Sequence, residues 1–159
     1  MDSCVRVTVK SFFCLVQEVL KELKVLSDAK SIKLVYEPLV SLPKILADAD
    51  KLKEVVKNLV DNAIKYTVGA GTVTVWHEIK GQMLVTHIKD TGLGISAKHQ
   101  DKLFQKFYRV KTDKTQEIQG TGLGLWIIKQ LLEKMNGAIC CQSEEGKGST
   151  FSFSLPLVS

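Results

Sequence analysis

Apolar and polar positions follow two different periods along the chain, and these periods separate expected helices from expected strands. Apolar residues three and four positions apart predict helices over 12–26, from about 50 to 66 and over 122–136, with a short helix over 96–107. Alternation at every second position, or a short apolar run between turn residues, predicts strands over 5–10, 32–37, 72–80, 83–90, 138–142 and 149–156. Strands and about three helices are thus interspersed, which favours a two-layer α/β sandwich.

Turn and cap residues fix several of these boundaries. Gly81-Gln82 predicts a hairpin between two strands, Asp48 or Asp50 can cap the middle helix, and Asn136-Gly137 ends the last one. Residues 108–119 are polar and lack apolar periodicity, which predicts a mobile loop. No internal repeat or linker interrupts the 159 residues, so we expect a single domain over 1–159.

Composition and charge narrow the class of protein. The net charge of +5 suits an anionic partner, but acidic and basic residues are mixed and no arginine-rich tract occurs, which argues against nucleic-acid binding. No signal peptide and no apolar run of about 18 residues occurs, so we expect a soluble fragment without membrane contact. The cysteines lack zinc or C-x-x-C spacing, and we interpret them as small buried hydrophobic side chains in a reducing compartment. They are Cys4, Cys14, Cys140 and Cys141.

The helix from about 50 to 66 carries a polar stripe beside its apolar face. The stripe consists of Glu54, Asn58, Asn62 and Lys65. Asparagine is about 0.5–0.7 kcal/mol less favourable than alanine in a helix, so two of them need a reason. Amide oxygens are suitable ligands for a magnesium ion that keeps most of its waters, and a lysine one turn further on can meet phosphate. When this helix is considered alone, a polar face exposed to solvent is the alternative interpretation of the stripe.

Two glycine-containing segments lie at the ends of predicted elements: the first follows a strand, and the second precedes a helix. In "IKDTGLGI", Asp90 has the strand parity of buried positions, and Gly92 and Gly94 allow a flat group to approach closely. A purine amine is a fitting donor for this carboxylate, although a simple turn is the alternative. In "GTGLGLWIIKQLLE", Gly120, Gly122 and Gly124 lead into an apolar helix, where free backbone N–H groups can bind an anion. This spacing matches neither a dinucleotide fingerprint nor a Walker loop.

Together, these segments carry a resemblance to a known family. The order of the asparagine helix, D-x-G-x-G and G-x-G-x-G-L resembles the ATP-binding domain of sensor histidine kinases, a fold shared with type II topoisomerases, a heat-shock chaperone and mismatch-repair ATPases. "LFQKFYR" and "GKGSTFSFSLP" extend the resemblance to about residues 3–158. It implies an α/β (α+β) sandwich with a mixed, mostly antiparallel sheet on about three helices, and a mobile ATP lid formed by residues 108–119.

The resemblance also implies roles for individual residues. Asn62 would be the magnesium ligand with Asn58 assisting, Lys65 would reach phosphate, and Arg109 would contact the γ-phosphate. Asp90 would accept the adenine amine, Tyr66 would pack on the base, and Thr150 would support the carboxylate through water. Phe104 and Phe107 would anchor the lid in the core. The remaining expected nucleotide contacts are Gly92, Gly94, Ile95, Gly120, Thr121, Gly122, Leu123, Gly124 and Leu125.

Position 58 distinguishes between branches of this fold. Relatives that hydrolyse ATP or phosphorylate serine carry a glutamate four residues before the metal asparagine, whereas an amide such as Asn58 cannot take a proton as a general base. Histidine phosphorylation is therefore favoured. His77 begins "HEIK", but the residues that follow do not fit a phosphoacceptor motif, and we predict that it lies in a strand of the ATPase domain. We interpret His87 as a structural strand residue and His99 as solvated on the short helix.

The resulting hypothesis is an Mg-ATP-binding catalytic domain that donates the γ-phosphoryl group to a histidine on a separate domain of the same parent protein, with a response regulator downstream. We expect a cytoplasmic monomer that lacks the phosphoacceptor and dimerisation segment, and leave open whether the parent is anchored to a membrane. The alternatives are a non-catalytic interaction module of the same fold and an ATP-hydrolysing or serine-kinase relative.

Overall fold

The computed structural model describes residues 5–7, 9–41 and 43–158, and it has two layers. One layer is a five-stranded sheet in the order β2-β4-β5-β7-β6. These strands are β2 (Ile32–Glu37), β4 (Gly71–Lys80), β5 (Met83–Asp90), β7 (Gly148–Pro156) and β6 (Ala138–Glu144). Only β2 and β4 run parallel, and the other neighbours are antiparallel. The expected mixed, mostly antiparallel sheet is therefore confirmed.

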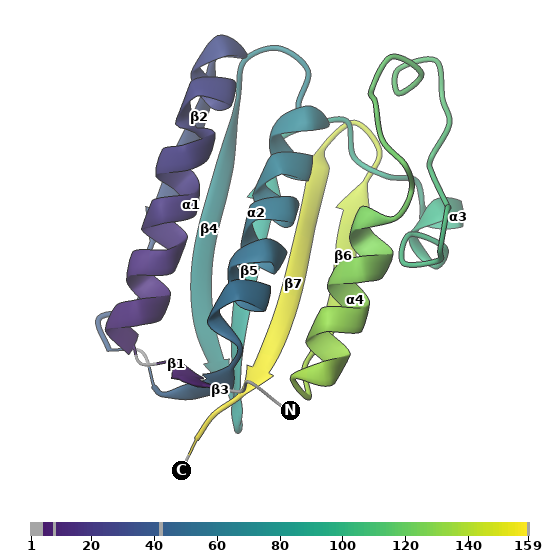
Figure 1. Ribbon diagram of the computed structural model, residues 1–159. Coiled ribbons are helices and arrows are strands. Elements are labelled where there is room, and N and C mark those ends of the chain that lie inside the picture. Colours follow the sequence, from purple (N-terminus) through teal and green to yellow (C-terminus); the bar gives the residue numbers. More distant parts are fainter. Residues whose placement is uncertain (1–4, 8, 42, 159) are drawn as a thin grey trace.

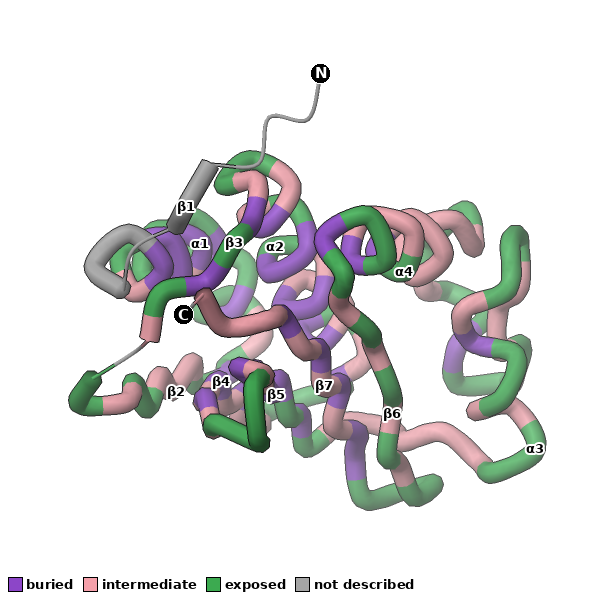
Figure 2. Tube along the Cα trace, turned by 90° about the horizontal axis from the view of Figure 1, so that it is seen from below, coloured by how far each residue is buried: buried purple, intermediate pink, exposed green. Residues whose placement is uncertain are grey.

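The other layer consists of three helices on one face of this sheet. These are α1 (Val9–Ala29), α2 (Ala49–Lys65) and α4 (Gly124–Lys134). Figure 1 shows them side by side in front of the strands, and Figure 2 shows buried segments concentrated between the two layers. Among the residues that the structure describes, no helix covers the opposite face of the sheet. No helix in the described part of the chain has both the length and the apolar character needed to cross a bilayer.

Helix α2 lies at the centre of the helical layer, and its buried apolar side chains form a continuous stripe. The side chains that it buries are Leu52, Val55, Val56, Leu59, Val60, Ala63 and Ile64. Asp48, not Asp50, is the N-cap, and its carboxylate accepts hydrogen bonds from the backbone amides of Asp50 and Lys51. Burial on one side leaves the polar stripe of this helix facing the space beside α4.

The structure differs most from the sequence-based expectation in three elements. The strand expected over 5–10 ends earlier, as β1 (Val5–Val7), because α1 already begins at Val9. Its partner β3 (Ile45–Ala47) lies in a segment where no strand was expected. The helix expected over 96–107 is only α3 (Ala97–Gln100), since the turns after it are closed by bonds between residues three apart. The hairpin at Gly81-Gln82 and the left-handed Asn136 at the end of α4 are confirmed.

The expectation of buried cysteines is wrong for two of them. Cys14 and Cys140 are exposed, whereas Cys141 is half-buried. Cys140 and Cys141 alternate between the two faces of β6, as predicted. Burial raises the pKa of the Cys141 thiol to about 12, so this thiol is protonated at neutral pH. Cys4 lies outside the described residues.

His77 is a buried strand residue, as predicted, and its burial has a consequence for stability. Its ring nitrogens lie 2.9 Å from the hydroxyl oxygen of Tyr36 and 2.8 Å from that of Thr86. Burial lowers the pKa of His77 from 6.5 to about 4, because the charged ring would lose its hydration. The folded state therefore favours the neutral ring. Its stabilising contribution is complete above pH 6.5 and is lost as pH falls from 6.5 towards 4.

We expect His77 to account for about 3 kcal/mol of the loss of unfolding free energy between pH 7 and pH 4. Chemical denaturation at a series of pH values should show a smaller loss in His77→Gln, whose amide does not titrate. An equal loss in the variant and the parent protein would contradict this assignment.

Candidate nucleotide site

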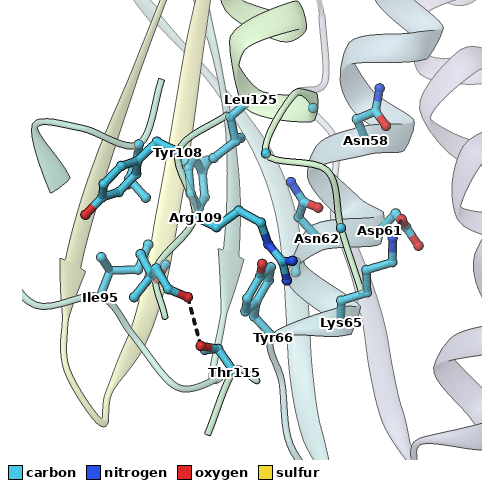
Figure 3. A pocket seen from close by; sticks show the side chains of 18 of the residues that line it. Asn58, Asp61, Asn62, Lys65, Tyr66, Ile95, Tyr108, Arg109, Thr115 and Leu125 are labelled. Atoms are coloured by element: carbon cyan, nitrogen blue, oxygen red, sulfur yellow. Dashed lines mark hydrogen bonds and ion pairs between the residues drawn. The ribbon is translucent and has the colours of Figure 1, made fainter. Parts of the chain in front are cut away.

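A cavity of about 360 Å³ lies between α2, the end of β5, the start of α4 and the loop that joins α3 to α4. Most of the predicted site residues line it. They are Asn58, Asn62, Lys65, Tyr66, Asp90, Gly94, Ile95, Arg109, Gly120, Thr121, Gly122, Gly124 and Leu125. Figure 3 shows how side chains from these separate segments surround the same space. Segments more than 60 residues apart in the sequence are thus brought together by the fold.

The polar stripe of α2 forms one wall of the cavity. Asn58 and Asn62 are both half-buried, and in the part of the chain that the structure describes no hydrogen bond engages either carboxamide. The Lys65 ammonium forms an ion pair with the Asp61 carboxylate, at 2.8 Å between Nζ and Oδ2. Figure 3 shows both side chains at the same end of the wall as Tyr66. Glu54, one turn before Asn58, is exposed and does not line the cavity.

Asp90 lies at the inner end of the cavity. It is only 3% exposed, which confirms the strand parity predicted for it. One carboxylate oxygen accepts a hydrogen bond from the Gly92 amide at 2.8 Å. Burial raises the pKa of Asp90, while the backbone amides of Gly92 and Ser149 act in the opposite direction. A desolvated acceptor of this kind suits a ligand that brings its own N–H donor.

The two glycines after Asp90 are required by the packing of their own loop. A Cβ atom on Gly92 would lie 2.3 Å from the carbonyl oxygen of Tyr66, and one on Gly94 would lie 1.9 Å from that of Glu144. Gly94 also has a φ of +68°. Of the two, Gly94 lines the cavity and Gly92 lies behind Asp90. The glycines therefore keep the loop close enough to shape the pocket around Asp90.

The glycine triplet leads into α4 and brings its free amides to the cavity. Gly122 has a φ of +75°, and its carbonyl accepts a hydrogen bond from the Phe107 amide at 2.9 Å. Leu123 is the N-cap of α4, so the first backbone N–H groups after it have no carbonyl partner within the helix. With Gly124 lining the cavity, this helix end presents donors to a ligand anion.

The segment expected to be the lid covers one side of the cavity. Arg109 lines it, and its guanidinium donates a hydrogen bond to the Ile118 carbonyl within the same segment. The Thr115 hydroxyl donates to the Val110 carbonyl at 2.8 Å, which closes a compact turn. Phe104 packs edge-on against Phe151 and anchors this segment, as expected. Phe107 is 66% exposed, so the expectation that it is a core anchor is wrong.

The sequence of this chain is similar to those of a known family of ATPases. The profile described as "Histidine kinase-, DNA gyrase B-, and HSP90-like ATPase" matches residues 47–159, which is more than half of the chain. The chain belongs to this family. The sensor protein SrrB of Staphylococcus aureus is 40% identical over 109 residues, which cover 69% of this chain.

Solved structures narrow this ATPase family to its histidine kinase branch. The catalytic domain of histidine kinase ThkA in a nucleotide-free form is 28% identical, with a TM-score of 0.77 and 90% of each chain covered. Full-length ShkA in complex with AMPPNP is 29% identical, with a TM-score of 0.82, covering 99% of this chain and 32% of that one. The predicted resemblance and fold are confirmed, and the chain is a histidine kinase ATPase domain. It spans about a fifth of the length of the curated relatives it matches.

Three predicted contacts of this ATPase domain lie outside the cavity lining, and one needs correction. Gly92 donates its amide hydrogen bond to Asp90, and Leu123 is the N-cap of α4, as described above. Thr150 is wrong as the support of Asp90, because it pairs with Lys89 on the outer face of the sheet. Ser149 pairs with Asp90 and lines the cavity instead. Strand alternation would have identified Ser149, since Phe151, Phe153 and Leu155 share its parity.

Sequence reasoning also missed cavity residues and misjudged one histidine. Asp61 lies four residues before Lys65, a spacing that predicts their ion pair. Tyr108, Val110, Thr115 and Gln119 line the cavity from the lid segment and had no periodic signal. His87 is a structural strand residue, as predicted, with ring nitrogens 2.6 Å from Ser152 and from Glu78. His99 was expected to be solvated, but it is half-buried and hydrogen-bonded to the Tyr108 hydroxyl.

Proposed function

We propose that this domain binds Mg-ATP in the cavity and donates the γ-phosphoryl group to a histidine on a separate domain of its parent protein. The observation that carries the proposal is the convergence of Asn62, Asp90 and Gly122 on one cavity of about 360 Å³. These residues come from α2, the end of β5 and the entry to α4. Each contributes a different chemistry: a hard oxygen ligand, a buried acceptor and a turn that exposes backbone donors.

The base would enter the inner end of the cavity. Asp90 would accept a hydrogen bond from the adenine amine, which offsets the cost of keeping the carboxylate ionised while buried. Tyr66 and Ile95, which also line the cavity, would pack against the faces of the ring. The phosphates would then lie towards the entry to α4, where Gly120, Thr121 and Gly124 line the cavity.

The outer part of the cavity suits a metal-bound triphosphate. The carboxamide of Asn62 is a neutral hard ligand that no described residue engages, so its oxygen is available to magnesium, with Asn58 one turn away. Magnesium, when bound, would neutralise phosphate charge and polarise the transferred group. Lys65 and Arg109 would supply further positive charge once they exchange the Asp61 and Ile118 contacts for phosphate oxygens.

Asn58 favours phosphoryl transfer over hydrolysis. Its carboxamide lies on the cavity wall where an activating carboxylate would have to stand, and it cannot remove a proton from water. The acceptor imidazole is itself a nucleophile, so this domain need only position the nucleotide and balance charge. The cognate response regulator would then receive the phosphoryl group from the acceptor histidine.

Transfer in trans tests this proposal. Radiolabelled ATP is incubated with this domain, with the separate phosphoacceptor domain of the parent protein, and with both together. We expect acid-labile label on the acceptor domain only in the mixture, and none on this domain alone. ATP turnover by the domain alone would favour the hydrolysing relatives. Partner binding that is indifferent to nucleotide would favour a non-catalytic interaction module.

A further inference from the structure

The loop that carries the base side of the site is held by the end of β6 and by the turn between β6 and β7. The Ser143 hydroxyl accepts a hydrogen bond from the Ile95 amide at 2.7 Å, and the Gly146 amide donates to the Leu93 carbonyl at 2.7 Å. The side-chain amide of Gln100 donates to the carbonyls of Ile95 and Ser143, at 2.9 and 2.8 Å. Ser143 does not itself line the cavity, so any effect on a ligand passes through its neighbours.

The hydrogen bonds of Ser143 fix the direction of a second hydroxyl. Its oxygen lies 2.9 Å from the Gly148 carbonyl, which can only accept, so the single proton of Ser143 is used there. The oxygen of Ser149 lies 2.7 Å from that of Ser143. Since Ser143 has no second proton, Ser149 must be the donor in this contact. The two lone pairs of Ser143 then accept from Ile95 and Ser149, and the hydroxyl is fully satisfied.

This donor direction determines what Ser149 can offer to a ligand. Ser149 is 6% exposed, lines the cavity and is the cross-strand partner of Asp90. Because the Ser149 proton is directed to Ser143, the Ser149 hydroxyl can only accept hydrogen bonds from a ligand in the cavity. Asp90 and Ser149 therefore present two adjacent acceptors and no side-chain donor, which matches a primary amine with two N–H groups.

We propose that Ser143 is a positioning residue that makes the inner end of the cavity an acceptor-only surface and thereby selects a 6-amino purine over a 6-oxo purine. The inference rests on the proposed nucleotide function, which it extends to base selection. A 6-oxo purine places a carbonyl oxygen against these acceptors, and Ser149 cannot turn its proton towards it while Ser143 holds that proton. Loss of the Ser143 hydroxyl frees the Ser149 proton to rotate.

Calorimetric titration with ADP and with inosine diphosphate tests this inference in the intact domain. In Ser143→Ala we expect the preference for ADP over inosine diphosphate to fall about three- to tenfold, the worth of one hydrogen bond, and Ser143→Thr to restore it. The matched control is Ser154→Ala, a serine of β7 on the outer face of the sheet that pairs with Val85; it should leave the preference unchanged. A role only in folding would lower both affinities equally.

An unchanged ratio of the two affinities in Ser143→Ala, at any absolute affinity, would overturn the inference. If that variant does not fold, Ser149→Ala replaces it, since it removes the acceptor itself and should lower the same ratio; an unchanged ratio there would overturn the inference equally. These outcomes differ from failure of the proposed function. In that case the unmodified domain would bind neither nucleotide, whereas equal binding of both would overturn only the selection proposed here.

Discussion

Replacing Asp90 with asparagine is expected to lower the affinity of the domain for ADP about 100-fold while leaving the fold at least as stable. The amide keeps an oxygen for the Gly92 N–H but turns an N–H₂ donor towards the cavity, where the adenine amine is also a donor. Losing a charged acceptor and facing two donors costs about 3 kcal/mol of binding free energy. Isothermal titration calorimetry in the presence of magnesium measures this change.

The stability of the same variant should move in the opposite direction. Burial raises the pKa of Asp90, so the folded state holds this proton more tightly than the unfolded chain does. The contribution of this carboxyl to the free energy of unfolding therefore falls as pH rises above its usual pKa, so burial of Asp90 carries a penalty at neutral pH. Asp90→Asn removes that penalty, and thermal unfolding at pH 7 should occur at the same or a higher temperature.

Asp101→Asn is the matched control for both measurements, because Asp101 is an exposed carboxylate outside the cavity. It should change neither the ADP affinity nor the unfolding temperature. If Asp90→Asn bound ADP as tightly as the parent domain, the assignment of Asp90 to the base would be wrong.

The second large effect is expected at Asn62, where alanine should remove most of the magnesium dependence of ADP binding. In the parent domain, magnesium should tighten binding because Asn62 offers an oxygen ligand that makes no other described hydrogen bond. We expect the ratio of affinities with magnesium and with a chelator to fall about tenfold in Asn62→Ala. Because alanine is the better helix former, α2 should gain up to about 0.5 kcal/mol of stability.

Glu54→Ala provides the control on the same stripe of α2. It also replaces a polar helix residue with alanine, but Glu54 is exposed and lies away from the cavity. It should leave the magnesium dependence unchanged. An equal magnesium effect in Asn62→Ala and in the parent domain would assign the metal ligand elsewhere.

Both predictions concern residues, Asp90 and Asn62, that lower the stability of the folded domain when no ligand is considered. A buried carboxylate and an asparagine within a helix each cost folding free energy, and a packing argument accounts for neither. This is why the sequence could indicate the site before the fold was known. Residues that break a local rule without a structural gain are expected where a ligand is bound.

The sequence predicted the periodic elements well because their pattern is set by one buried face. The apolar stripe of α2 and the alternation of Phe151, Phe153 and Leu155 on β7 lie in the core as predicted. The short strand β3 was missed because three residues are too few to establish a period. The helix expected over 96–107 ends early because the turns that follow α3 are closed by hydrogen bonds between residues three apart, which the apolar pattern does not distinguish from a helix.

Within the site, the sequence motifs identified cavity residues correctly. The sequence did not identify the residues that strand register or long-range contacts bring to the cavity. Thr150 and Ser149 are neighbours in the sequence, but only the pairing of Ser149 with Asp90 places one of them at the cavity. The contact between Ser143 and Ile95 joins residues 48 positions apart and has no local signal. The lid residues that line the cavity lie in turns without periodicity, so no pattern identified them.

Nuclear magnetic resonance titration of the ¹⁵N-labelled domain with Mg-ADP shows whether the three separated segments bind one nucleotide. We expect the Asn62 side-chain amide and the backbone amides of Gly92 and Gly122 to shift together, with one common dissociation constant. Shifts confined to one of these segments, or separate dissociation constants for them, would contradict it.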